Sequence, residues 1–174
     1  MTYNELLTLK GTNNISFADM LQTQEWIDKR KKIIMRDKNK CRNCGVFPTD
    51  TEEDIFGNFQ FHFWFINDDL DIRVAKRPYH LEVFHKYYII NRLPWEFNDD
   101  ALITLCQYCH EDFHKKNNLK VFASDGITPI EIAICSKCNG SGYLPEYHHV
   151  QSGICFKCRG NGNDFFNMKF NSTI

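Results

Sequence analysis

The stretch Leu105-Cys106-Gln107-Tyr108-Cys109-His110-Glu111-Asp112-Phe113-His114 decides the fold of this 174-residue chain. It is a Cys-x-x-Cys motif that runs into a predicted helix, from Cys109 to about residue 117. His110 and His114 are four residues apart, so a helix places them on one face. An earlier stretch, Leu81-Glu82-Val83-Phe84-His85-Lys86-Tyr87-Tyr88, is the centre of a predicted strand over 79–88. A hairpin and a helix of this kind would bring His85, His110 and His114 together.

All eight cysteines fall in Cys-x-x-Cys pairs, and none is left over. No secretion signal is visible at the start of the chain, so we expect a reducing cytoplasm and free thiols rather than disulfides. Four pairs at this spacing predict two structural Zn²⁺ sites, because two thiolates two residues apart can bind one metal. A thiol oxidoreductase is the alternative, although a redox motif is usually single. The first predicted site joins Cys41, Cys44, Cys106 and Cys109, and the second joins Cys135, Cys138, Cys155 and Cys158.

The bulk composition is that of a soluble globular protein, with 43% hydrophobic and 25% charged residues. No apolar run approaches the roughly 18 residues of a membrane span, so we expect no membrane partner. The net charge of −1 does not indicate a nucleic-acid binder, but basic residues concentrate between positions 29 and 42. Those from Lys29 to Arg36 lie on an amphipathic helix predicted from about Ala18 to Arg36, which docks by Trp26 and Ile33/Ile34. They form either a solvated helix face or a phosphate-binding surface; with Lys86, the candidates for DNA contact are Lys29, Arg30, Lys31, Lys32, Arg36 and Lys38.

The remaining pattern is mixed. Residues 50–54 are predicted to form an acidic loop, 58–66 a half-buried strand, 67–71 a turn and 72–75 a return strand. Asp99 and Asp100 can cap a short helix that begins near Ala101. The best boundary lies at the Ser124-Asp125-Gly126 turn. We therefore expect an N-terminal arm and basic helix over 1–40, a central domain over 41–123, and a zinc module with an apolar tail over 124–174.

The three histidines suit one kind of chemistry. Hydrolysis of a phosphodiester needs a general base that activates water and a cation that stabilises the developing charge. A histidine on a strand beside a histidine pair on a helix can supply the base and hold the cation. The cysteines of the first predicted zinc site bracket the strand in sequence, so the zinc would fix this geometry.

Residues from about Trp26 to Lys116 resemble an HNH (ββα-metal, His-Me finger) endonuclease with an accessory four-cysteine zinc. The resemblance rests on Cys41-x-x-Cys44-Gly45, on Leu81-Glu82-Val83-x-His85-Lys86-x-Tyr88, on Pro94-Trp95-Glu96, and on Leu102-Ile103-Thr104-Leu105-Cys106-x-x-Cys109-His110-x-x-x-His114. It covers roughly half of the chain. It implies an α+β fold, with His85 as the general base and His110 and His114 as ligands of a catalytic divalent cation (Mg²⁺, Mn²⁺, Ni²⁺ or Zn²⁺).

The chain departs from the family pattern at two positions. A metal ligand of the family falls on Phe84, and the Asn that orients the base falls on Ala101. Three readings follow. The site works with the two helix histidines and water, or with a carboxylate or Asn from elsewhere, such as Asn91, Asn98, Asp99 or Asp100. Alternatively, the fold is catalytically degenerate and only binds nucleic acid or a protein, or the chain carries an inactivating substitution.

Residues 135–162 contain the repeat Cys-x-x-Cys-x-Gly-x-Gly twice and resemble half of a DnaJ-type zinc module, a small zinc-binding β-hairpin domain. Such modules bind polypeptides or nucleic acid or serve only a structural purpose, so this module or the apolar tail is a candidate surface for a protein partner. The leading hypothesis is a metal-dependent endonuclease that acts on DNA in a bacterial or phage setting, including defence. The alternative is a non-catalytic zinc adaptor with the same fold.

Overall fold

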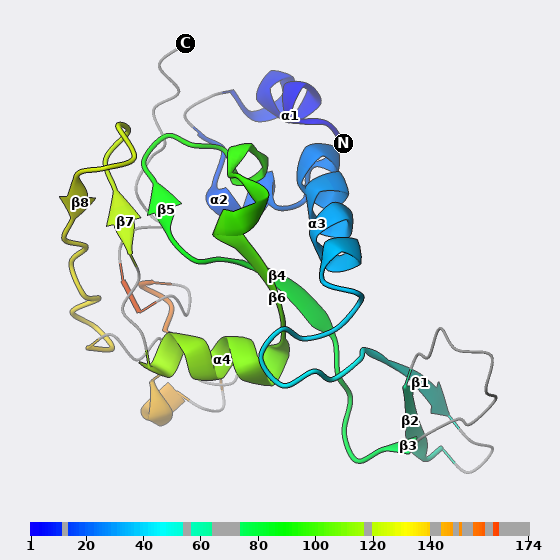
Figure 1. Ribbon diagram of the computed structural model, residues 1–174. Coiled ribbons are helices and arrows are strands. Elements are labelled where there is room, and N and C mark those ends of the chain that lie inside the picture. The colour runs from blue at the N-terminus through cyan, green and yellow to red at the C-terminus, as the bar shows by residue number, and fades with distance from the viewer. Residues whose placement is uncertain are drawn as a thin grey trace. The chain divides into compact units, whose positions relative to one another are not determined.

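The computed structural model describes residues 1–11, 14–53, 57–63, 74–116, 120–139, 144–147, 150, 155–158 and 162–163 (Figure 1). Helices and strands are mixed along the chain. The chain forms two compact units, each built from separate segments: residues 1–28, 87–97 and 118–174 make the first, and residues 29–86 and 98–117 make the second. The boundaries expected from the sequence, at 40/41 and 123/124, stay a prediction.

Three helices open the chain: α1 (Tyr3–Lys10), α2 (Phe17–Met20) and α3 (Gln24–Arg36). The first two begin with reciprocal caps, in which a hydroxyl and a carboxylate three residues apart each accept a backbone N–H. The sequence predicted one helix from Ala18 to Arg36, but the structure has a break at 21–23. There the Thr23 hydroxyl donates to the Met20 carbonyl at 2.8 Å. This side-chain bond competes with continued helix and ends α2.

A small sheet and a core complete the described first unit. Strand β5 (Tyr88–Ile89) pairs in parallel with β7 (Val121–Phe122), and β7 pairs antiparallel with β8 (Pro129–Ile130). A 3-10 helix lies at Pro94–Glu96 and another at Pro145–Tyr147. The core joins residues that the sequence keeps far apart, namely Phe17, Met20, Tyr88 and Val121. Their burial fixes β5 and β7 against α2.

In the second unit a three-stranded antiparallel sheet follows α3: β1 (Thr49–Glu53), β2 (Phe59–Phe63) and β3 (Val74–Ala75). The acidic segment 50–54 was predicted to be a loop, but residues 50–53 lie in β1. They pair with β2 from Asp50↔His62 to Glu53↔Phe59. Backbone pairing at a sheet edge needs no hydrophobic pattern. The acidic composition of this segment therefore gave no sign that it forms a strand. Residues 64–73, with the predicted turn at 67–71, lie outside the described residues.

The strand-strand-helix element of the second unit consists of β4 (Leu81–His85), β6 (Leu102–Cys106) and α4 (Gln107–Lys116) (Figure 1, green). The two strands are antiparallel, in a register from Leu81↔Cys106 to His85↔Leu102. The helix expected near Ala101 is one 3-10 turn over Asp99–Ala101, and the apolar run after it is a strand. A short continuous apolar run does not distinguish a buried strand from a helix by periodicity. Among the described helices, none has the length and hydropathy of a membrane span.

Candidate metal centres and the strand-helix site

The first four-cysteine cluster closes the strand-strand-helix element. Cys41 and Cys44 lie in the loop after α3, Cys106 ends β6, and Cys109 lies in the first turn of α4. The four Sγ atoms lie within 4.8 Å of one another, and Cys44 Sγ is 3.8 Å from Cys106 Sγ. A tetrahedral zinc with thiolate bonds of about 2.3 Å separates its sulfurs by about 3.8 Å. The cluster therefore has the donor set and spacing of a structural zinc site.

The loop between Cys41 and Cys44 donates hydrogen bonds to two of the cluster's sulfur atoms. The Cys44 N–H donates to Cys41 Sγ at 3.5 Å, and the Asn43 side chain donates to Cys109 Sγ at 3.3 Å. Gly45 has φ of +74°, which suits glycine, and its N–H donates to the Cys41 carbonyl. Burial opposes ionisation of Cys41, but backbone N–H groups from Cys44, Cys106 and Asn43 lower its pKa to about 7. Burial raises the pKa of Cys44 to about 12, so the thiols of this cluster do not ionise alike before a metal binds.

The second four-cysteine cluster, Cys135, Cys138, Cys155 and Cys158, is buried. Sγ contacts of 3.9 Å and 3.6 Å join each cysteine of the first pair to one of the second. The Gly162 N–H donates to Cys158 Sγ at 3.2 Å, and the Cys135 N–H donates to the Gly162 carbonyl at 2.9 Å. This cluster too fits a structural zinc ion. Both predicted groups of ligands are therefore confirmed as clusters that can hold a metal.

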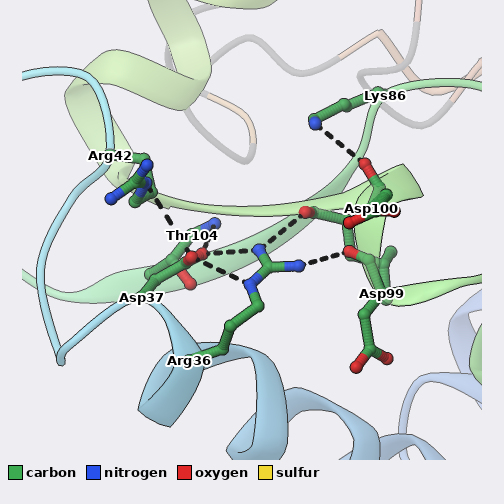
Figure 2. A network of polar contacts seen from close by, with 8 residues as sticks. Arg36, Asp37, Arg42, Lys86, Asp99, Asp100 and Thr104 are labelled. Carbon is green, nitrogen blue, oxygen red and sulfur yellow. Dashed lines mark hydrogen bonds and ion pairs between the residues drawn. The ribbon is translucent and has the colours of Figure 1, made fainter.

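A buried carboxylate ties the first zinc loop to β6 and α3 (Figure 2). Asp37 is only 5% exposed and accepts the Thr104 backbone N–H at 2.9 Å and the Arg36 guanidinium at 2.9 Å. The Arg42 backbone N–H donates a hydrogen bond to the Thr104 carbonyl at 2.8 Å. Burial opposes ionisation of Asp37, but the bonds from Arg36 and Thr104 hold its pKa below the usual value. The ionised carboxylate thus anchors the zinc loop.

Most of the basic residues predicted to contact DNA have partners within the second unit. Lys29 and Lys32 both pair with Asp99 at 2.8 Å. Arg30 donates to the Leu81 carbonyl at 2.6 Å. Arg36 donates to the carbonyls of Asp99 and Leu102, and Lys86 donates to the Asp100 carbonyl (Figure 2). These contacts join α3 to the start of β4, to the turn at Asp99–Ala101 and to the start of β6, so these side chains have a structural role.

Phe84 lies on the face of β4 that meets α4. Its ring centroid is 4.9 Å from that of His110 and 4.7 Å from that of Phe113, and the residue is 4% exposed. The position to which the family pattern assigns a metal ligand is therefore part of the hydrophobic core. Phenylalanine offers no donor atom, so any metal near His110 needs a ligand from another position.

His85 is the last residue of β4 and pairs with Leu102. Successive side chains of a strand point to opposite faces, so His85 lies on the face away from Phe84. It is 3% exposed. His114 lies in α4, and its side chain is outside the described part of the chain. The structure thus brings His110 to the face of β4 opposite to that of His85, and with the His114 side chain outside the described residues the meeting of all three histidines stays a prediction.

Glu82, to which the sequence assigned no role, contacts both His110 and His80. Glu82 accepts from His110 Nδ1 through Oε2, and its Oε1 lies 3.3 Å from His80 Nε2. The hydrogen bond from His110, against the effect of burial, lowers the pKa of Glu82, with a smaller contribution from His80. The alternation of side chains along a strand places residues 80, 82 and 84 on one face, and this could be read from the sequence. Which face of β4 meets α4 depends on the pairing of β4 with β6, and the sequence did not show that.

Compared with models of known protein families, with curated proteins and with solved structures, the chain matches none of them. Its own side chains form two clusters of four cysteines that can each hold a metal ion, in a fold of mixed helices and strands.

Proposed function

We propose that this chain is an HNH-type (ββα-metal) endonuclease that hydrolyses DNA phosphodiester bonds with a divalent cation. The observation that carries the proposal is the order and pairing of β4, β6 and α4, with the first zinc cluster at their junction. Two antiparallel strands and a helix in this order are the architecture that the resemblance implies. His85 ends the first strand and would be the general base.

The zinc cluster supports this function by fixing geometry. Cys106 and Cys109 hold the end of β6 to the start of α4, where His110 immediately follows. Glu82 holds the Nδ1 side of His110. A carboxylate on one ring nitrogen is the usual arrangement for a histidine whose other nitrogen binds metal. Catalytic groups need to be placed within a fraction of an ångström, and these contacts restrict both backbone and ring.

The C-terminal cluster fits a DnaJ-type zinc module, since each of its Cys-x-x-Cys pairs is followed by the Gly-x-Gly pattern. Gly162 of that pattern has φ of +71° and donates to Cys158 Sγ. We assign the module a structural or partner-binding role beside the nuclease. A cytoplasmic location agrees with eight reduced cysteines.

A second function, a non-catalytic adaptor that keeps the fold to bind nucleic acid or a protein, is favoured by two observations. Phe84 packs in the core where a ligand is expected, and His85 is 3% exposed. A base must reach the water that it activates. The adaptor would bind DNA with a strong salt dependence and would leave it intact.

One experiment separates the two functions. Protein that carries two zinc ions is incubated with supercoiled plasmid and Mg²⁺, Mn²⁺, Ni²⁺ or additional Zn²⁺, beside a His85→Ala variant with the same zinc content. Metal-dependent nicking that the variant lacks supports the endonuclease. Retarded but intact plasmid with every metal supports the adaptor and removes the endonuclease.

A further inference from the structure

We propose that an exposed patch on the second zinc cluster binds single-stranded nucleic acid by stacking its bases. The patch, called the aromatic-lysine patch below, consists of Lys137, Tyr147, Phe156 and Lys157. It belongs to the first unit, whereas β4, β6 and α4 belong to the second. Binding there goes beyond the proposed function and does not depend on it, because the second unit can cut or spare DNA without the patch.

The two Cys-x-x-Cys pairs of the zinc module build most of the patch. Lys137 lies inside the first pair, and Phe156 and Lys157 lie inside the second. The four cysteines are buried, whereas these residues between them are exposed. Lys157 donates from Nζ to Ser136 Oγ at 2.7 Å, which joins one pair to the other. A zinc ion held by the cysteines would therefore also fix the base of the patch.

Two aromatic rings reach solvent beside these lysines. Tyr147 ends the 3-10 helix Pro145–Tyr147 and is 38% exposed, and Phe156 is 63% exposed. Their ring centroids lie 5.8 Å apart and their planes meet at 79°, so the edge of one ring meets the face of the other. The contact holds each ring in a defined orientation. A flat base can then stack on an exposed face with little further ordering of the protein.

Positive charge lies next to both rings. Lys137 Nζ is 5.8 Å from the Tyr147 centroid and 5.5 Å from the Phe156 centroid, within the roughly 6 Å range of a cation–π contact. The phosphate of a nucleotide is one sugar away from its base, so an ammonium group beside a stacking ring is placed to meet it. Aromatic faces combined with cations that follow the backbone are the two parts of a site for unpaired strands.

The same features favour an unpaired strand over a duplex or a protein. The bases of a duplex stack on one another and cover their faces, whereas an unpaired strand offers them to aromatic side chains. An apolar protein surface would leave two ammonium groups without a counter-charge, and a phosphate backbone supplies it. Glu146 is exposed and adjoins Tyr147 in the sequence, so its carboxylate should weaken the binding of phosphate.

The test is fluorescence anisotropy of labelled oligothymidylate and oligouridylate, each about eight nucleotides long. The full chain carries two zinc ions, and no other divalent cation is added. We expect Phe156→Ala to weaken binding at least about fivefold, because a stacking ring is lost, and Phe156→Trp to bind at least as tightly as the unaltered chain. Lys137→Gln should lower the slope of log affinity against log salt concentration by about 0.7, the value of one phosphate contact on a single strand. Glu146→Gln should bind more tightly at low salt.

Ile134→Ala is the matched control. Ile134 is 67% exposed, close to the 63% of Phe156, and it also directly precedes or follows no residue of the patch but adjoins a zinc-module cysteine, Cys135. Its aliphatic side chain cannot stack a base, so this variant should keep both the affinity and the two zinc ions. A blunt DNA duplex is the second control, and Phe156→Ala should bind it as the unaltered chain does.

Two results would overturn the proposal: neither oligonucleotide binds the unaltered chain, or Phe156→Ala and Ile134→Ala bind both oligonucleotides equally well. Either result leaves the patch to a protein partner. If Phe156→Ala loses zinc, Phe156→Trp decides, because it keeps a ring and its added tryptophan fluorescence should be quenched when a base stacks on it. Unchanged fluorescence in Phe156→Trp, together with an unchanged salt slope in Lys137→Gln, rejects stacking at this patch.

Discussion

Replacement of Asp37 by alanine should loosen the strand-strand-helix element more than any surface change. The carboxylate is 5% exposed and accepts from a backbone N–H and a guanidinium, both at 2.9 Å (Figure 2). Alanine leaves the buried Thr104 N–H without its acceptor, which costs about 1–3 kcal/mol. It also removes a charged hydrogen bond, worth about 1.5–3 kcal/mol. The Arg36 side chain is 34% exposed, so water replaces part of that bond, and we expect a loss of about 3 kcal/mol.

Amide hydrogen exchange, measured by mass spectrometry on peptides from β6 and α4, gives this quantity locally. A loss of about 3 kcal/mol speeds exchange by about a hundredfold, since 1.36 kcal/mol is tenfold. Asp112→Ala is the control, because its partner Lys116 lies one helical turn away and both side chains are at least 60% exposed. Such a pair contributes about 0.3–0.5 kcal/mol, so exchange should change by about twofold.

The Asp37→Ala substitution should also change zinc binding. Arg42 fixes the first zinc loop to Thr104, so Asp37→Ala should weaken zinc at Cys41/Cys44/Cys106/Cys109 and leave the second cluster unchanged. If Asp37→Ala and Asp112→Ala exchange within threefold of each other, the carboxylate does not hold the element together. The buried Thr104 N–H would then lose little free energy without its acceptor.

Three further predictions follow from the same geometry. Cys106→Ser should reduce the two structural zinc ions to one and expose β6 to proteolysis, while Cys158→Ser should lose the other zinc; measured zinc content checks both. Phe84→His should add a ligand at the family position and raise cleavage or metal affinity, at a cost of about 1–3 kcal/mol for the lost packing against Phe113; equal metal affinity in both proteins would contradict it. The pKa of Asp99 is lowered to about 2, first by Lys29 and then by Lys32, so its ionised form stabilises the folded state above the unfolded pKa of about 3.9 and this gain fades as pH falls toward 2. The difference in urea stability between the unaltered chain and Asp99→Asn should thus be small, constant from about pH 5 to 8, and smaller in acid.

The features that sequence predicted well are those set by spacing. A Cys-x-x-Cys pair limits where its partners can lie, and the two clusters of four formed as expected. The helix with His110 and His114 and the strand that ends at His85 also occur, with bounds shifted by a few residues.

The features that it missed depend on pairing between distant residues. Asp99 lies 70 residues from Lys29 in the sequence. The composition of residues 29–42 alone therefore indicated a basic run, whereas in the fold some of these residues form ion pairs. Strand β1 is acidic and exposed, so no hydrophobic alternation marked it. Glu82 gained its significance only when α4 brought His110 to it. In each case the deciding partner comes from a different segment, and a single sequence carries no record of which segments meet.

The central claim is that His85 activates water for DNA hydrolysis, and chemical rescue tests it most directly. Supercoiled plasmid is incubated with zinc-loaded His85→Gly protein and a divalent cation, with and without added imidazole. We predict that nicking is lost in this variant and partly restored by imidazole, which occupies the space of the missing ring. Nicking by the variant at the rate of the unaltered protein, without imidazole, would contradict the claim. So would a failure of the unaltered protein to cut the plasmid with any of the metals tested.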